Sequence, residues 1–201
     1  MRRVSKKPVV VAIVGLPGSG KSSIAEYLAK LIGAKVISAN AIRVALRKQN
    51  RGYGQVEIIM EKEALSAIKR RKNIILDSDF SDSKKRRRLE RKAGKAAKIV
   101  YIRTYANRDI TIGRLLNARY TPNDLYGGAS TDWRGNNKGA VVALREMWRR
   151  TPHHYRWSPQ NGGQFVLKKL PIKFLAEIDT GKNWRQKVRQ AAKKLKWGGK
   201  S

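Results

Sequence analysis

The sequence contains no cysteine, and this absence excludes two kinds of structure. A chain without thiols forms no disulfide and offers no thiolate to a metal ion. It also suits a reducing compartment, so we expect a cytoplasmic protein. Long apolar runs are missing as well, because the basic segment 1–8 is followed by only six apolar residues, Val9–Val14. That run is too short for a signal peptide or a membrane span, and we expect no membrane partner.

Acidic residues are scarce. The chain has 14 Asp and Glu against 46 Lys and Arg, which gives a formal net charge of +32. A surface this basic favours a polyanionic partner, RNA or DNA, because each phosphate that it neutralises releases counterions; such binding weakens with salt. The basic residues concentrate in Lys84–Arg88, continued to Lys98, and in 182–200. The alternative is a solvated surface that is simply rich in lysine and arginine.

Several of the aromatic residues alternate with arginine. The segment Trp148–Trp157 reads Trp-Arg-Arg-Thr-Pro-His-His-Tyr-Arg-Trp, and Tyr126 and Trp133 precede it. This mixture suits stacking on unpaired bases, although core packing is the commoner role of tryptophan. His153 and His154 have no cysteine or acidic residue near them in the sequence, so we interpret both as structural and not as metal ligands.

One binding motif is complete. Residues Gly15–Ser22 fit the phosphate-binding loop G-x-x-x-x-G-K-[ST], and they lie between the apolar run and a helical pattern over 22–31. The glycines allow backbone N–H groups to converge on phosphate oxygens at the positive end of the helix. We expect Lys21 to reach the β- and γ-phosphates of ATP and Ser22 to ligate Mg²⁺; the alternative is an accidental glycine-rich turn. The predicted nucleotide-binding residues of the loop are Gly15, Gly18, Ser19, Gly20, Lys21, Ser22 and Ser23.

Strand and helix patterns alternate along the rest of the chain. Strands are predicted at 35–38, 73–77, 97–102 and 174–180, and helices at 40–49, 55–71, 82–93, 107–119, 138–150 and 183–197. This alternation predicts an α/β fold with a P-loop NTPase- or kinase-like parallel sheet, covered by helices on both faces. We expect a single domain over 1–201, with a lid and substrate-loop region at about 107–163 and a basic C-terminal helix at about 183–197. The segment after 150, through Gly163, is predicted to be irregular.

Four features in this order carry a resemblance: the phosphate loop, Ile74–Asp79, the arginine-rich helix after Ile102, and Ile178–Thr180. Together they resemble P-loop kinases of the polynucleotide-kinase and zeta-toxin-like group, in the P-loop nucleoside triphosphate hydrolase superfamily. The resemblance covers about residues 9–119, with a weaker similarity at 174–195. It implies ATP and Mg²⁺ as cofactors.

The resemblance also implies roles for particular side chains. The acid at the end of the third apolar strand, Asp77, would lie beside Mg²⁺. Its alternative role is to cap the next helix, for which Asp79 or Asp82 is better placed, and the role of Asp79 stays open. Arginines of the lid would clamp the phosphates: Arg114 as a catalytic residue and Arg119 as a nucleotide contact, with Arg108 earlier in the same helix. The alternative is that these arginines reflect the composition of the chain.

The family pattern is broken after the second strand. Members usually carry Asp-x-x-Arg there, whereas this chain has Asn40-Ala41-Ile42-Arg43. Arg43 could still hold a substrate phosphate, but the amide of Asn40 is essentially non-basic, and Asn40 could equally be a helix N-cap. Three outcomes stay open: Asp77 or Asp79 replaces the base, transfer proceeds with little help from a base, or the protein binds nucleotide without being a kinase.

These observations predict an ATP-dependent phosphotransferase that acts on a hydroxyl of a polyanionic substrate, foremost the end of an RNA or DNA. A kinase-derived, ATP-binding module that acts as an RNA- or ribonucleoprotein-binding factor is the first alternative. A small-metabolite kinase is the second. The oligomeric state is not predicted by any feature of the sequence.

Overall fold

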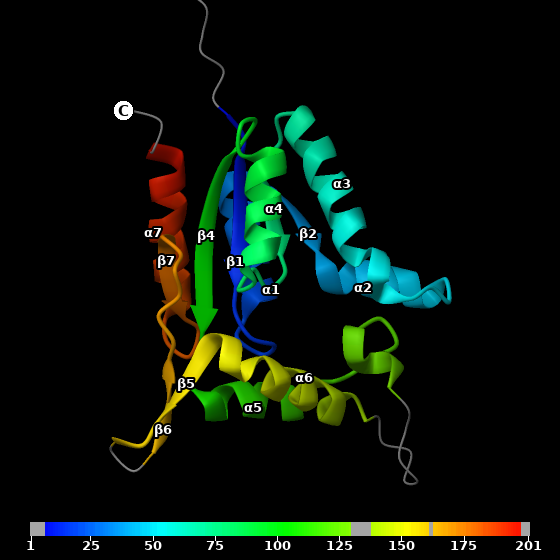
Figure 1. Ribbon diagram of the computed structural model, residues 1–201, viewed down its shortest axis with the longest axis vertical. Coiled ribbons are helices and arrows are strands. Elements are labelled where there is room, and N and C mark those ends of the chain that lie inside the picture. The colour runs from blue at the N-terminus through cyan, green and yellow to red at the C-terminus, as the bar shows by residue number, and fades with distance from the viewer. Residues whose placement is uncertain (1–6, 130–137, 161–162, 198–201) are drawn as a thin grey trace, which may run out of the picture.

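The computed structural model describes residues 7–129, 138–160 and 163–197, and Figure 1 shows the path of the chain. The strands are β1 (Val9–Val14), β2 (Lys35–Ser38), β3 (Ile74–Asp77), β4 (Lys98–Tyr105), β5 (Tyr155–Ser158), β6 (Gln164–Leu167) and β7 (Phe174–Asp179). The helices are α1 (Lys21–Ile32), α2 (Ala39–Lys48), α3 (Val56–Lys69), α4 (Ser83–Ala93), α5 (Arg108–Leu116), α6 (Gly139–His154) and α7 (Trp184–Trp197). Two short 3-10 helices, η1 (Tyr53–Gln55) and η2 (Leu125–Gly128), precede α3 and α6. Within the described ranges, none of the helices combines the length and the apolar composition that a membrane span requires.

Five strands form one parallel sheet in the order β2-β3-β1-β4-β7. The central strand β1 is buried along its whole length, and this explains why its sequence is continuously apolar instead of alternating. Val10 pairs with Ile74 of β3 on one side and with Ile99 of β4 on the other. Because the strands run in one direction, the loops that follow β1, β2 and β3 meet at a single edge of the sheet. The structure confirms the predicted α/β fold.

Helices cover both faces of this sheet, as the sequence predicts. Alternate residues of β1, from Val10 to Val14, pack with α2, α3 and α4, whereas those from Val9 to Ile13 pack with α1 and α7. In Figure 1, α4 lies in front of the sheet and α1 behind it. The two apolar clusters fix the direction of α1 relative to β1, and so fix the loop between them.

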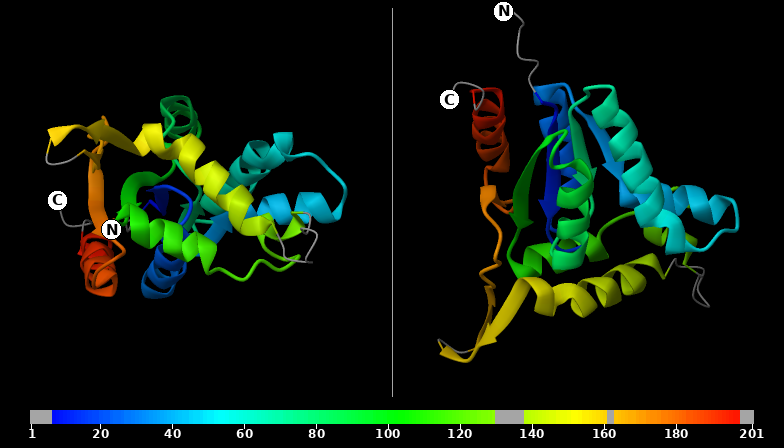
Figure 2. Two further views of the ribbon diagram at one scale, coloured as in Figure 1. Left: turned by 90° about the horizontal axis from the view of Figure 1, so that it is seen from below. Right: turned by 45° about the horizontal axis from the view of Figure 1, so that its top comes forward.

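Helices α5 and α6 cross the carboxyl edge of the sheet, as Figures 1 and 2 show. Leu16, in the loop after β1, packs with Leu115 of α5 and with Ala143 and Met147 of α6. Burying one large apolar side chain contributes about 1.5–3 kcal/mol, so this small cluster is enough to attach both helices to the phosphate loop.

The structure differs from the prediction made from the sequence between residues 150 and 167. The predicted end of α6 at 150 is wrong, because the helix continues through Pro152 to His154. Proline usually ends a helix by removing a donor and by crowding the carbonyl four residues earlier. Here the buried side chains of Thr151 and His154 hold the last turn, and Thr151 Oγ1 donates to the Met147 carbonyl at 2.9 Å.

The predicted irregular segment is also wrong in part. β5 and β6 pair as an antiparallel hairpin in which Trp157 lies opposite Phe165. Pro159 and Gly163 favour an irregular interpretation, yet they belong only to the connection between the strands. The strand signals are the alternation of aromatic and polar residues in Tyr155–Ser158 and the short apolar run at the end of Gln164–Leu167.

Candidate functional site

The phosphate loop has the conformation that its glycines predict. Gly18 and Gly20 adopt positive φ angles of 78° and 81°, and Gly20 is the N-cap of α1. A Cβ at Gly15 would collide with Thr104 Oγ1 of β4, so that position needs glycine because of a close approach. Ser19 is buried, and its hydroxyl lies 2.8 Å from Thr104 Oγ1. The Ser19 side chain therefore joins the phosphate loop to β4.

Lys21 is the first residue of α1, and its ammonium group bends back over the loop. Its Nζ donates to the Leu16 carbonyl at 2.7 Å. Burial lowers the pKa of Lys21 from its usual value, against the opposing attraction of Asp79 and Asp77. A cation held in this partly buried position interacts more strongly with a phosphate that enters the loop than an exposed lysine would, because less water screens it.

Ser22 and Asp77 form the pair that a metal ion would need. Ser22 Oγ donates to Asp77 Oδ2 at 2.8 Å, and Ser38 Oγ donates to the same oxygen at 3.3 Å. A serine hydroxyl beside a strand-end carboxylate is a hard oxygen pair of the kind that Mg²⁺ binds next to nucleotide phosphates. The residues therefore fit Mg²⁺, and Ser22 and Asp77 are the ones that would hold it. When bound, the ion would neutralise charge on the β- and γ-phosphates.

Asp79, two residues further on, has a different environment. Its Oδ1 accepts from the Gly15 N–H at 3.3 Å and from the Ser81 N–H at 3.1 Å, and its Oδ2 accepts from Ser81 Oγ at 2.9 Å. His154 Nε2 lies 2.9 Å from the same Oδ2. Burial alone would raise the pKa of Asp79, but the hydrogen bond and charge of His154, with Lys21 and Ser81, hold the pKa well below its usual range.

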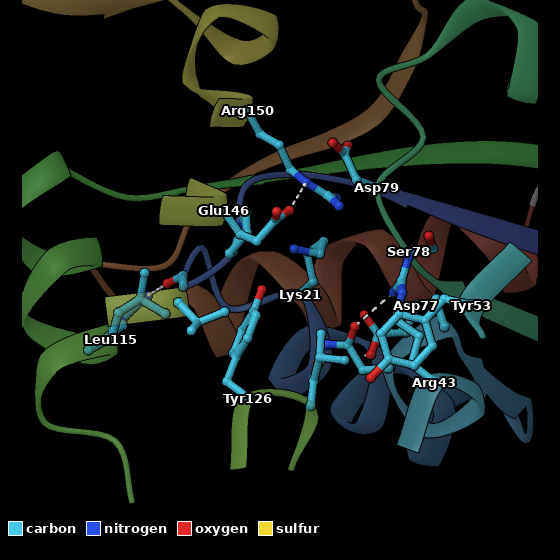
Figure 3. Close-up of a pocket in the computed structure, with 18 of the residues that line it drawn as sticks. Lys21, Arg43, Tyr53, Asp77, Ser78, Asp79, Leu115, Tyr126, Glu146 and Arg150 are labelled. Atoms are coloured by element: carbon cyan, nitrogen blue, oxygen red, sulfur yellow. Dashed lines mark hydrogen bonds and ion pairs between the residues drawn. The ribbon is translucent and has the colours of Figure 1, made fainter. Parts of the chain in front are cut away.

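A cavity of about 730 Å³ opens from the phosphate loop. Figure 3 shows Lys21 near its centre, with Glu146 and Arg150 on one side and Arg43 and Tyr126 on another. Its charged and polar lining comes from Lys21, Ser22, Ser23, Asn40, Arg43, Arg47, Tyr53, Asp77, Ser78, Asp79, Arg114, Tyr126, Glu146, Arg149 and Arg150. The cavity therefore reaches well beyond the phosphate loop, into a region that α2, η2 and α6 line with arginine and tyrosine.

Asn40 and Arg43 lie together on the wall that α2 contributes. Arg43 Nη1 donates to Asn40 Oδ1 at 3.1 Å. The alternative role of Asn40 as a helix N-cap is wrong, because Ser38 occupies that position and accepts from the Ala41 N–H. For α4, the helix that follows β3, the cap is Asp82, one of the two residues that the sequence favours over Asp77.

The predicted lid arginines have three different environments. Arg114 lines the cavity, and its guanidinium donates to the Gly18 carbonyl at 3.2 Å and to Thr180 Oγ1 at 2.8 Å, so it braces the loop against the segment after β7. Arg119 is exposed beyond the end of α5 and outside the set of lining residues. Arg108 also lies outside that set, with its guanidinium carbon 4.4 Å from the centre of the Trp148 ring.

Sequence reasoning missed several residues of the cavity: Arg47, Tyr53, Glu146, Arg149 and Arg150. On α6 a signal was present, because Val142, Glu146 and Arg149 recur at helical spacing and face one side. On α2 the same signal was present for Arg47, which follows Asn40 and Arg43 at helical spacing. Arg47 donates to the carbonyls of Leu125 at 2.8 Å and Asp124 at 3.0 Å, contacts that only the folded chain brings together.

A parallel sheet of this order, with a phosphate loop between its central strand and the following helix, defines the P-loop kinase fold. The sequence model of the AAA domain family matches residues 10–121, which is more than half of the chain, and the chain belongs to that family. A search of curated proteins found no match.

Solved structures share this fold over nearly the whole chain. A Chloroflexus aurantiacus protein with a provisional description as a kinase has 16% identity and a TM-score of 0.61, over 96% of this chain and 98% of its own. The Mycobacterium tuberculosis APS kinase CysC has 12% identity and a TM-score of 0.60, over 96% of this chain and 99% of its own. A gluconokinase from Sinorhizobium meliloti has 13% identity and a TM-score of 0.51, over 97% and 99%. Identities this low show the fold, and the polynucleotide-kinase and zeta-toxin-like subgroup stays a prediction.

Proposed function

We propose that the protein is an ATP-dependent phosphotransferase that moves the γ-phosphate of ATP to a hydroxyl of an anionic acceptor. One observation carries the proposal: a single cavity joins the phosphate loop to Arg43, Arg149 and Arg150, which come from α2 and α6. Three arginines from two helices, in the same cavity as the phosphate loop, provide a binding region for a second anionic molecule. The whole chain acts in this proposal as one kinase-like domain, with 107–163 as its lid and substrate region.

The phosphate side of the site supplies charge and position. Lys21 would interact with the β- and γ-phosphates, and Ser22 with Asp77 would hold Mg²⁺. Arg114 keeps the loop in shape through Gly18 and Thr180, and it faces the same cavity. Phosphoryl transfer depends mainly on such positioning and electrostatic stabilisation, so these residues account for most of the catalysis that the site can provide.

The acceptor side favours a substrate that carries negative charge and a flat ring. Arg149 and Arg150 both interact with the single carboxylate of Glu146, so this wall keeps a net positive charge. Tyr53 and Tyr126 line the same region and offer ring faces. With a net charge of +32, the end of an RNA or DNA is the acceptor that we favour. Because neighbours of the same fold are described as an APS kinase and a gluconokinase, a small anionic metabolite is the alternative acceptor.

The geometry of the cavity narrows the choice of a general base. Asp79 is unsuited to accept a proton, because it already accepts from Gly15, Ser81 and His154 and its pKa is held low. Asn40 lines the cavity but cannot act as a base. Glu146 also lines the cavity, but its carboxylate pairs with Arg149 and Arg150, which lower its pKa. The remaining choices are Asp77 and a transfer that needs little base help, which a loose transition state allows.

The second candidate function is a kinase-derived, ATP-binding module that recognises RNA without transferring phosphate. The observation in its favour is the Asn40 amide at the acceptor wall, where its oxygen is occupied by Arg43.

The deciding experiment incubates the protein with γ-labelled ATP, Mg²⁺ and separate acceptors: a 5′-hydroxyl RNA, a 5′-hydroxyl DNA, nucleosides, and small anionic alcohols. Labelled product with the nucleic acids supports the favoured acceptor, and labelled small molecules support the alternative. ATP binding with no labelled acceptor in any arm would contradict the enzyme proposal and favour the binding module.

A further inference from the structure

An aromatic ladder lies outside the cavity, where the β5–β6 hairpin meets α5 and α6. The guanidinium carbon of Arg108 lies 4.4 Å from the centre of the Trp148 ring and 5.3 Å from that of Phe165. The Phe165 and Trp157 rings follow, edge to face, with centroids 5.1 Å apart. We call the set Trp148, Arg108, Phe165 and Trp157 the hairpin ladder. Figure 1 shows the hairpin projecting from the body of the domain at the C-terminal end of α6.

Both ends of the hairpin ladder are open to solvent. Trp157 is 56% exposed and Trp148 is 40% exposed, although they are among the largest apolar side chains of the protein. The inner members explain how the hairpin is anchored, since two strands alone are marginally stable in water. Anchoring does not require the exposed rings at the two ends. A single exposed apolar residue is ordinary, but two tryptophans at the ends of one ordered ladder indicate a contact surface.

The Trp157 ring, at one end of the hairpin ladder, is held in a defined orientation. Trp157 packs edge to face with Phe165 on one side, and it lies so close to Gly163 that a Cβ there would meet the ring 2.5 Å from Cζ2. Gly163 also has a φ of 77°, which a larger residue would adopt only with strain. The ring is thus ordered before any partner arrives, and a partner that stacks on it loses little additional side-chain entropy.

The end of α6 and the β5–β6 hairpin carry charged residues of one sign. Between Glu146 and Glu177 the sequence contains six Lys or Arg and no acidic residue. Within that stretch Arg156, Lys168 and Lys169 are exposed on or beside the hairpin. An acidic protein would match this charge, but exposed indole faces beside scattered cations match unpaired bases on a phosphate backbone more closely.

We propose that the hairpin ladder binds single-stranded nucleic acid, with bases stacked on Trp157 and Trp148 and phosphates near Arg156, Lys168 and Lys169. Trp148 is followed directly in α6 by Arg149 and Arg150, which line the cavity. A strand held on the ladder therefore has a cationic path along α6 to the acceptor region. The binding stands without the proposed kinase activity, and only the delivery of an end to the cavity rests on that function.

The test measures binding without ATP, so that it is independent of transfer. Fluorescence anisotropy would follow labelled single-stranded RNA and DNA of about 12 nucleotides, within the range of known single-strand sites, and a duplex of the same sequence. We expect the single strands to bind more tightly than the duplex. Trp157→Leu and Trp148→Leu should each weaken single-strand binding about fivefold or more, the loss expected for one stacked base, while Trp157→Phe should stay close to the wild type.

The matched control is Trp184→Leu on α7, which also removes a tryptophan beside an arginine, since Arg185 lies over the Trp184 ring. We expect that variant to bind within about twofold of the wild type. Salt titration separates the two kinds of contact. In a double variant, Lys168→Gln with Lys169→Gln, the slope of log affinity against log salt should become less negative by about 0.7 for each lost phosphate contact. Trp157→Leu should leave this slope unchanged.

Photocrosslinking of RNA that contains 5-iodouridine to the wild-type protein tests the same surface without a variant, so misfolding of a variant cannot affect the result. We expect crosslinks at Trp157 or Trp148. Crosslinks only elsewhere, equal affinity for duplex and single strand, or complete competition by polyglutamate would overturn the proposal, the last in favour of an acidic protein partner. Lys21→Ala should bind RNA as the wild type does, so loss of kinase activity and loss of this surface are distinguishable.

Discussion

His154 Nε2 lies 2.9 Å from Asp79 Oδ2, and this buried contact joins the last turn of α6 to the chain just after β3. The same carboxylate accepts the N–H of Gly15, the first residue of the phosphate loop. The carbonyl of His154 in turn accepts from the buried Arg103 of β4 at 3.1 Å. The position of α6, which carries the arginines of the cavity wall, is thereby tied to the phosphate loop.

The first prediction concerns this contact. Asp79→Asn should destabilise the protein at neutral pH by about 1.5–3 kcal/mol, because the buried hydrogen bonds from Gly15, Ser81 and His154 lose their ionised acceptor. The pKa of Asp79 is lower in the folded chain than in the unfolded one. Its contribution is therefore complete above the unfolded pKa of about 4 and is lost as the pH falls through that value toward the folded pKa.

Urea unfolding of the wild type and Asp79→Asn across this pH range measures the effect. We expect the difference in free energy of unfolding to narrow in acid. Glu63→Gln is the control, because its carboxylate forms an exposed ion pair with Lys35 at 2.9 Å, and it should cost about 1 kcal/mol or less. An Asp79→Asn variant as stable as Glu63→Gln at neutral pH would show that the buried contact is unimportant.

The contact between Asp79 and His154 also shows where prediction from the sequence ends. The strand β1, its loop and α1 are contiguous, and local pattern was sufficient to place Lys21 and Ser22. Asp79 and His154 are far apart in the sequence, and His154 follows a proline that suggests the end of a helix. Only the packing of α6 across the sheet edge brings them together, so no local pattern predicts that they pair.

The arginines with which α2 and α6 line the cavity were also predictable only in part. Arg43 was found because it sits at a fixed spacing after β2, in a pattern that a family shares. Arg150 was missed because its role depends on which face of α6 meets the cavity. Arg119 was expected at the nucleotide, but α5 ends at Leu116 and leaves that side chain exposed.

The second prediction tests the phosphate loop. Lys21→Ala should weaken ATP binding and abolish transfer, because it removes the cation that reaches the β- and γ-phosphates. Lys30→Ala, an exposed lysine in the last turn of the same helix, removes the same charge from the chain and should change neither property. Titration calorimetry with ATP and Mg²⁺, beside a turnover assay, checks both variants. Equal behaviour of the two would rule out a specific role for Lys21.

The third prediction tests the cationic wall. Arg150→Ala should raise the KM for the acceptor by about tenfold or more, the effect of losing one hydrogen bond to a charged group, with a smaller change in ATP affinity. Arg145→Ala removes an exposed arginine of the same helix that lies outside the cavity lining, and it should leave both values near the wild type. Steady-state kinetics at saturating ATP provides the comparison. A larger effect on ATP affinity than on acceptor KM would place Arg150 at the nucleotide instead.

The last prediction concerns Asn40, where the enzyme and the binding module differ. If the usual base is missing and nothing replaces it, Asn40→Asp should raise phosphoryl transfer by about two to four orders of magnitude, the usual effect of a positioned base. If Asp77 acts as the base, Asn40→Asp should be neutral or harmful and Asp77→Asn should abolish transfer. Because Asp77 also contacts Ser22 at the proposed metal site, ATP affinity must be measured with turnover to separate lost metal binding from lost base catalysis. Transfer by Asn40→Asp but by no wild-type preparation would make the natural protein a binding module. Strong transfer by the wild type that Asn40→Asp does not increase would show that the site works without a carboxylate at position 40.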